Sequence, residues 1–165
     1  MYIDRAAHGG WWSLTNRIAQ LRKVISILRE RDLVWLRALW LGAAAAVEHM
    51  NALYQANPRM VVDIGANRGQ FALAARHSRP GLRVVSFEPL ARPATVFERI
   101  FARDPRVTLH RVAIGPRRET TTIHVSGRDD SSSLLGITSL QSDTYPGTGE
   151  VAIEACEVAP LADFL

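Results

Sequence analysis

The amino-acid sequence predicts an α/β fold, namely half of an open, doubly wound parallel sheet preceded by a helical region. Two short apolar runs, residues 60–63 and 82–88, each end on an acidic residue, and a helical pattern follows each of them. A third run covers residues 107–112. Strands that alternate with helices are typical of parallel sheets. The break at Asn57-Pro58 divides the chain into an N-terminal helical region, 1–57, and a sheet domain, 58–165.

The helical region is predicted to form a hairpin of two helices. Residues 13–29 show one apolar stripe among basic side chains, and this stripe consists of Leu14, Ile18, Leu21, Ile25 and Leu28. Asp32 is a capping residue for a second helix that runs to Tyr54 and is apolar on most of its circumference. Two interpretations stay open: packing on the sheet domain or on a second chain, and peripheral contact with a membrane surface.

Residues 60–70 read as a strand, a tight loop and the start of a helix. In open α/β sheets, ligands bind at the carboxyl ends of the strands, where such a loop offers backbone N–H groups. Gly65 and Gly69 tolerate positive φ and permit close approach of a ligand. Asp63 places an acceptor-only carboxylate at this point, which suits a ligand with N–H or O–H donors better than a bare phosphate.

Glu88 ends the second apolar run, which is where an acid holds the ribose diol in folds of this kind. Asp63, Gly65, Gly69 and Glu88 together predict a nucleoside-shaped site. The spacing D-x-G-x-x-x-G differs from the dinucleotide fingerprint G-x-G-x-x-G in two ways: it has two glycines and not three, and an acid stands where the fingerprint has its first glycine.

The remainder of the chain continues the alternation and then changes character. Pro93 suits the first turn of a helix over residues 93–101, and a third strand runs from Val107 to Gly115. Residues 121–125 and 151–158 alternate like strands with one solvated face. The polar segment between them, 126–150, is either a disordered linker or a functional lid.

These motifs resemble the FkbM-type S-adenosylmethionine-dependent methyltransferases. The resemblance rests on V-V-D-I-G-A-N-R-G-Q-F, V-V-S-F-E-P-L and V-T-L-H-R-V-A-I-G, and on the later S-S-S-L and P-L-A-D-F-L. It implies a Rossmann-like class I methyltransferase fold, S-adenosyl-L-methionine as cofactor, and O-methylation of a sugar or natural-product hydroxyl. By position, it implies that Glu88 holds the ribose and that the methionine part is bound by Asp63, Gly65, Ala66, Asn67 and Gly69.

The resemblance also implies that further strands follow the P-L-A-D-F-L segment. Because the sequence stops at Leu165, we expect only the N-terminal half of the sheet. The first strand then has an unpaired edge, which favours association. Catalysis by this chain alone stays open, since no catalytic base can be assigned.

Composition limits the other classes of function. Cys156 is the single cysteine, so an internal disulfide is excluded and a reducing, cytoplasmic location is expected. Residues 1–118 hold 19 of the 20 Lys and Arg side chains but only half of the 16 acids. The basic residues are scattered, so no nucleic-acid site is predicted. The histidines show no metal-ligand spacing, and only His110 is kept as a candidate.

Three hypotheses of function remain. The first is a methyltransferase that acts on a small-molecule or glycan acceptor. The second is a non-catalytic module that binds cofactor or protein and forms a homo-oligomer. The third, an NAD-dependent oxidoreductase, is disfavoured by the missing glycine of the dinucleotide fingerprint.

Overall fold

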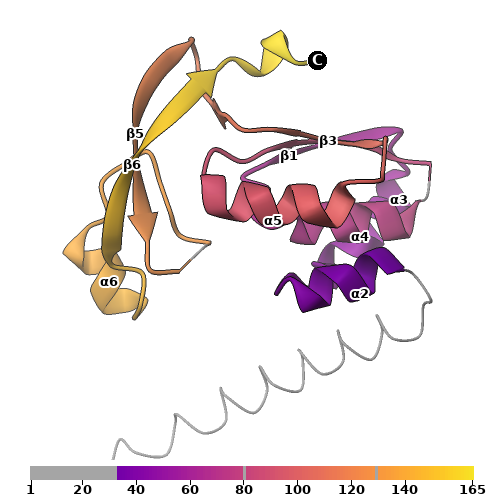
Figure 1. Ribbon diagram of the computed structural model, residues 1–165, viewed down its shortest axis with the longest axis horizontal. Helices are drawn as coiled ribbons and strands as arrows, with labels where there is room; N and C mark the ends of the chain where they lie inside the picture. Colours follow the sequence, from indigo (N-terminus) through magenta and orange to yellow (C-terminus); the bar gives the residue numbers. More distant parts are fainter. Residues whose placement is uncertain (1–32, 80, 129) are drawn as a thin grey trace, which may run out of the picture.

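The computed structural model describes residues 33–79, 81–128 and 130–165 (Figure 1). Their strands form two small sheets, and helices cover one face of the first sheet. The mixed α/β arrangement that the sequence predicts is therefore confirmed. The first predicted helix, residues 13–29, lies outside the described residues.

The first sheet consists of three parallel strands in the order β1-β2-β3, with β1 at Met60–Ile64, β2 at Arg83–Phe87 and β3 at Val107–His110. Helix α4, Gln70–Ser78, connects β1 to β2, and helix α5, Ala91–Phe101, connects β2 to β3. Both helices cover the same face of the sheet (Figure 1). Successive side chains of a strand point to opposite faces of the sheet. Val61 and Val84 therefore pack in the core under the helices, whereas Val62 and Val85 pack in a second cluster on the opposite face.

The predicted second helix is not continuous. Helix α2, Leu33–Trp40, is followed by a turn, by the 3-10 helix η1, Val47–His49, and by helix α3, Met50–Ala56. Gly42 ends α2 with φ +75°, and the N–H groups of Gly42 and Ala43 donate to the carbonyls of Leu39 and Ala38. This is a Schellman motif, in which glycine takes the left-handed position that terminates a helix. Asn57 ends α3 in the same conformation, as the prediction of a stop at Asn57-Pro58 required.

The helices before β1 share a core with the first sheet. Trp35, Ala38 and Leu53 are buried in the same cluster as the apolar residues of α4 and α5. Packing on the sheet domain is therefore confirmed for the described part of the helical region. Within the described ranges, no helix is long and apolar enough to cross a membrane.

The second sheet has the order β4-β6-β5, with β4 at Ala113–Ile114, β5 at Glu119–Ser126 and β6 at Glu150–Ala159. β5 and β6 are antiparallel, and the predicted linker between them contains helix α6, Ser139–Thr144. The 3-10 helix η2, Leu161–Asp163, follows β6. This sheet lies beside the carboxyl ends of the first sheet (Figure 1).

The prediction of a single strand from Val107 to Gly115 is wrong. β3 ends at His110, and the chain resumes strand pairing at Ala113, which pairs with Val158 of β6. The last ladder bond on the β2 side is the one from Glu88 N–H to the His110 carbonyl. Pro89 follows and offers no N–H, so the chain beyond His110 pairs with β6 instead.

The outer edge of β1 has no strand partner among the described residues, as predicted. Met60 and Ile64 at the two ends of β1 are 41% and 57% exposed. Such an edge carries unpaired N–H and C=O groups and is a template for strand addition.

Candidate functional site

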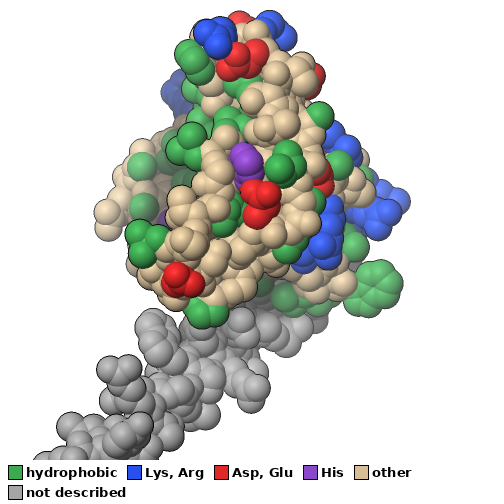
Figure 2. Space-filling view, turned by 90° about the vertical axis from the view of Figure 1, so that its left-hand side faces the viewer, with side chains coloured by type: hydrophobic (Ala, Val, Ile, Leu, Met, Phe, Trp, Pro, Cys, Tyr) green, Lys and Arg blue, Asp and Glu red, His purple; other side chains and the backbone are tan. Residues whose placement is uncertain are grey.

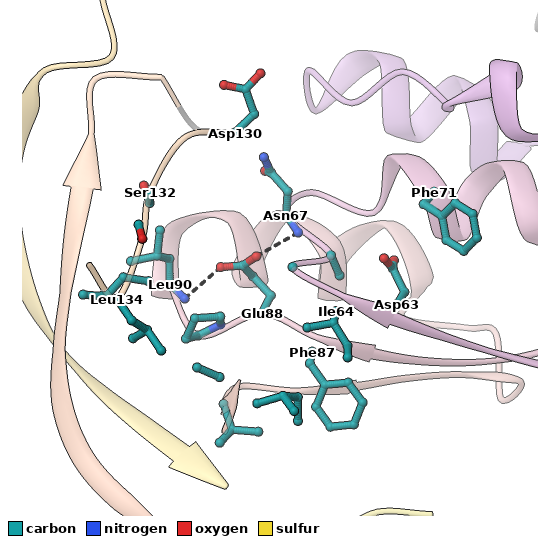
Figure 3. A pocket seen from close by; sticks show the side chains of 18 of the residues that line it. Asp63, Ile64, Asn67, Phe71, Phe87, Glu88, Leu90, Asp130, Ser132 and Leu134 are labelled. Atoms are coloured by element: carbon teal, nitrogen blue, oxygen red, sulfur yellow. Dashed lines mark hydrogen bonds between the residues drawn. The ribbon is translucent and has the colours of Figure 1, made fainter. Parts of the chain in front are cut away.

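A cavity of about 500 Å³ lies at the carboxyl ends of β1 and β2 (Figure 3). One side is formed by the loop after β1 and by the segment that connects β2 to α5, and the other by β5 and the segment that follows it. Five of the six predicted cofactor-binding residues line it, namely Asp63, Gly65, Ala66, Asn67 and Glu88. Parallel register brings the two acids together, since the ends of neighbouring strands meet at one edge of the sheet.

The loop after β1 is fastened to β2 through its backbone N–H groups. Gly65 N–H and Ala66 N–H both donate to the Phe87 carbonyl, at 3.0 and 2.9 Å. Asn67 N–H donates to Glu88 Oε2 at 2.8 Å. These three consecutive donors are therefore engaged within the protein. They do not form a cradle for a phosphate group, in agreement with the expectation that a bare phosphate is not the ligand.

Glu88 is buried, with 6% of its surface exposed, and both of its carboxylate oxygens accept backbone hydrogen bonds. Oε2 accepts from Asn67, and Oε1 accepts from Leu90 N–H at 2.9 Å (Figure 3). Burial raises the pKa of Glu88, while the two N–H donors oppose that rise. The carboxylate therefore holds the loop after β1 and the start of α5 in place, and it faces the cavity from the end of β2.

We expect Glu88→Gln to destabilise the fold by about 1–3 kcal/mol, because the amide retains one acceptor oxygen and directs an NH₂ group at a buried backbone donor. Urea denaturation measures this loss. The exposed carboxylate of Glu98 on α5, which is paired with Arg111, supplies the control Glu98→Gln, for which the expected loss is below about 1 kcal/mol. Equal losses in the two variants would contradict the assigned role of Glu88.

Asp63 is the second acid of the cavity, and its environment favours the neutral form. The pKa of Asp63 is raised from 3.8 to about 6, chiefly because burial disfavours the charged form; the nearby Ser86 hydroxyl and His49 lower the pKa, and the negative charge of Glu88 adds to the rise. Ser86 is paired with Asp63 across the β1–β2 ladder, but the two side chains do not meet hydrogen-bond geometry. Among the described residues, Asp63 Oδ2 and Ser86 Oγ are buried without a hydrogen-bond partner. Asp63 therefore has unused acceptor capacity.

The opposite wall contains the serine motif. Asp130, Ser132, Ser133 and Leu134 line the cavity across from the loop after β1 (Figure 3). This segment is held to β5, because His124 and Ser133 exchange backbone hydrogen bonds of 2.8 and 3.1 Å, and Ser126 N–H donates to Ser132 Oγ. The serine motif therefore lies on the far side of the cavity from the two predicted acids.

Gly69 is the one predicted site residue that does not line the cavity. Its φ is +92°, and a Cβ atom there would lie 2.7 Å from the Phe101 ring and 2.9 Å from the Phe97 ring. Gly69 is therefore required for the close packing of α5 against the start of α4. By contrast, Gly65 has φ +79° and open space where a Cβ atom would project, so its position does permit close approach of a ligand.

Some residues of the site carry no signal in the sequence. Phe71, Leu90 and Ile123 form apolar parts of the wall, and His49 lies close enough to Asp63 to affect its pKa. Only the fold brings these residues together. His110 does not line the cavity, and its ring packs in one cluster with those of Phe87 and Phe164. In the described part of the chain, no group of His, Cys, Asp or Glu side chains is arranged to hold a metal ion.

A comparison with protein-family models matches the methyltransferase FkbM domain over residues 63–164. The match begins at Asp63, includes Glu88 and the serine motif, and ends in the segment after β6. A search of curated proteins found no match. The family match covers more than half of the chain and agrees with the placement of two acids at the ends of adjacent parallel strands, and on this basis the chain belongs to the FkbM methyltransferase family.

Proposed function

We propose that this chain binds S-adenosyl-L-methionine in the cavity and that methyl transfer goes to a hydroxyl group of a sugar, a glycan or a natural product. One observation carries the proposal: the buried Glu88 and the half-buried Asp63, from neighbouring strands, line one cavity, while the three loop N–H donors beside them are already engaged. Such a site accepts hydrogen bonds and positive charge rather than anions.

The residues present fit this cofactor. Its amino group and its positively charged sulfur are suited to the unused acceptor capacity of Asp63. Its ribose hydroxyls are suited to Glu88, because each carboxylate oxygen has a second lone pair beyond the one that accepts a backbone N–H. The open space beside Gly65 admits a ligand close to the main chain. A cavity of about 500 Å³ lies within the usual range for small-molecule sites, about 300–1,000 Å³.

When bound, this cofactor supplies an electrophilic methyl group on a sulfonium sulfur. The chain's own residues orient the donor and exclude water on the apolar sides formed by Phe71, Phe87 and Leu90. An acceptor hydroxyl loses its proton as its oxygen gains the methyl group. Among the described residues that line the cavity, the titratable side chains are Asp63, Glu88 and Asp130, so a proton that stays in the site passes to one of these or to water.

Calorimetry with the full chain at pH 8 tests the proposal. We expect S-adenosyl-L-methionine to bind and Asp63→Ala to weaken that binding at least about tenfold, which is the usual effect of losing a charge-assisted hydrogen bond. The control Glu98→Gln, which removes a carboxylate outside the cavity, is expected to bind as the unaltered chain does. Absence of binding to a folded protein at millimolar cofactor would refute the proposal.

Calorimetry with NAD and light scattering separate the other two hypotheses from this proposal. An oxidoreductase binds NAD, whose pyrophosphate needs the N–H donors that Phe87 and Glu88 already occupy, so no NAD binding is expected. An interaction module is favoured by the open edge of β1. That alternative predicts association that does not change with cofactor, which light scattering with and without S-adenosyl-L-methionine detects.

A further inference from the structure

Helix α2 is apolar on its outer face as well as on its inner face. Trp35 and Ala38 are buried against the core, whereas Leu36 and Trp40, one turn apart, are 45% and 90% exposed. α2 lies outside α4 and α5, in the layer farthest from the sheet (Figure 1). An apolar outer face on such a helix requires apolar surroundings there as well as at the core.

A basic groove borders this outer face. It lies between α2 and the end of α5 and includes Val34, Arg37, Arg76, Arg103, Asp104 and Arg106. Asp104 is paired with Arg76 at 2.6 Å, whereas the side chains of Arg37, Arg103 and Arg106 form no ion pair with any residue that the structure describes. At 100° per residue, Arg37 lies between the Leu36–Trp40 stripe and Val34, so stripe and groove are adjacent.

We propose that the outer face of α2 and the basic groove beside it dock the protein on an anionic phospholipid surface. Tryptophan and leucine enter the boundary between headgroups and acyl chains, and neighbouring arginines bind lipid phosphates. Basic side chains gather along one side of the molecule, where hydrophobic side chains also reach the surface (Figure 2). The charge of the chain agrees, because 19 of the 20 Lys and Arg side chains lie in residues 1–118.

A second copy of the chain fits this surface less well than a lipid surface does, because it would bring one basic groove close to another, which is repulsive.

Sedimentation of the full chain with lipid vesicles tests this docking. We expect binding to vesicles that contain phosphatidylserine and phosphatidylcholine, much weaker binding to phosphatidylcholine alone, and loss of binding at high salt. Trp40→Ser is expected to weaken binding about tenfold. The double variant Arg103→Gln, Arg106→Gln is expected to weaken it about 25-fold, since each basic side chain near such a surface contributes about fivefold.

Matched controls come from the second sheet and from the segment just before β5. Ile153→Ser removes an exposed apolar side chain of β6, and Arg117→Gln with Arg118→Gln removes two exposed charges before β5. These variants are expected to bind vesicles as the unaltered chain does. The proposal is overturned if Trp40→Ser and the double variant Arg103→Gln, Arg106→Gln bind vesicles as the unaltered chain does. Vesicle binding that all variants retain would belong to another part of the chain, and it would not support docking through α2. A shift from dimer to monomer on Trp40→Ser in light scattering, without vesicle binding, would overturn it in favour of a second copy.

Discussion

Asp63→Asn is expected to make the protein more stable above pH 6 while weakening its binding of cofactor. The pKa of Asp63 is about 6 in the folded protein and 3.8 ordinarily, so the folded state holds the proton more tightly than the unfolded chain does. The stability gained by protonation is fully present below the ordinary pKa and is lost as the pH rises through about 6. Above that pH, the ionised carboxylate costs about 2–3 kcal/mol.

Thermal unfolding at two pH values measures this effect. At pH 8 we expect the variant to unfold roughly 5–10 °C above the unaltered chain, and at pH 4 we expect a small difference. The control Glu98→Gln removes an exposed carboxylate whose pKa is lowered by Arg111, so it is not expected to stabilise the fold at pH 8. An equal shift of Asp63→Asn at both pH values would show that side-chain packing, rather than ionisation, is responsible. The expected pattern is that of a functional site whose ionised group costs stability.

Gly69→Ala is expected to unfold the protein at a much lower urea concentration than Gly65→Ala. Both glycines have positive φ, so both substitutions strain the backbone, at about 1–2 kcal/mol each. At Gly69 the new Cβ atom also lies 2.7 Å from the Phe101 ring and 2.9 Å from the Phe97 ring, and two buried rings of α5 cannot both move away. Overpacking then adds about 1–3 kcal/mol.

The comparison of the two alanine variants separates packing from ligand access. Gly65→Ala places its Cβ atom in open space, so we expect a moderate loss of stability together with weaker cofactor binding. Similar urea midpoints for the two variants would mean that the contact of Gly69 with α5 does not limit stability. Circular dichroism follows both transitions.

Local patterns were sufficient to predict the part of the fold that forms the floor of the site. β1, α4, β2 and α5 follow one another with clear periodicity, and parallel pairing of neighbouring strands is what brings Asp63 close to Glu88. The family resemblance predicted from the same residues is also confirmed. The site residues themselves stay predictions, which the variants above test.

Other features depend on contacts that a linear pattern does not contain. The apolar pattern continues past Gly42, and only the left-handed conformation of that residue ends α2. The end of β3 depends on β6, a strand far along the chain that pairs with Ala113. The neighbours of Gly69 are rings on another helix, so no local pattern distinguishes the role of Gly69 from that of Gly65.

The attachment of the loop after β1 to the end of β2 makes the floor of the cavity preorganised. Phe87 and Glu88 hold three successive amides, so the conformation of this loop is set before any ligand arrives. Little conformational entropy is then lost when a ligand is seated there. An insertion or deletion in the loop would also withdraw the Asn67 N–H from Glu88, so a change in chain length at the loop would disturb the acid at the end of the neighbouring strand.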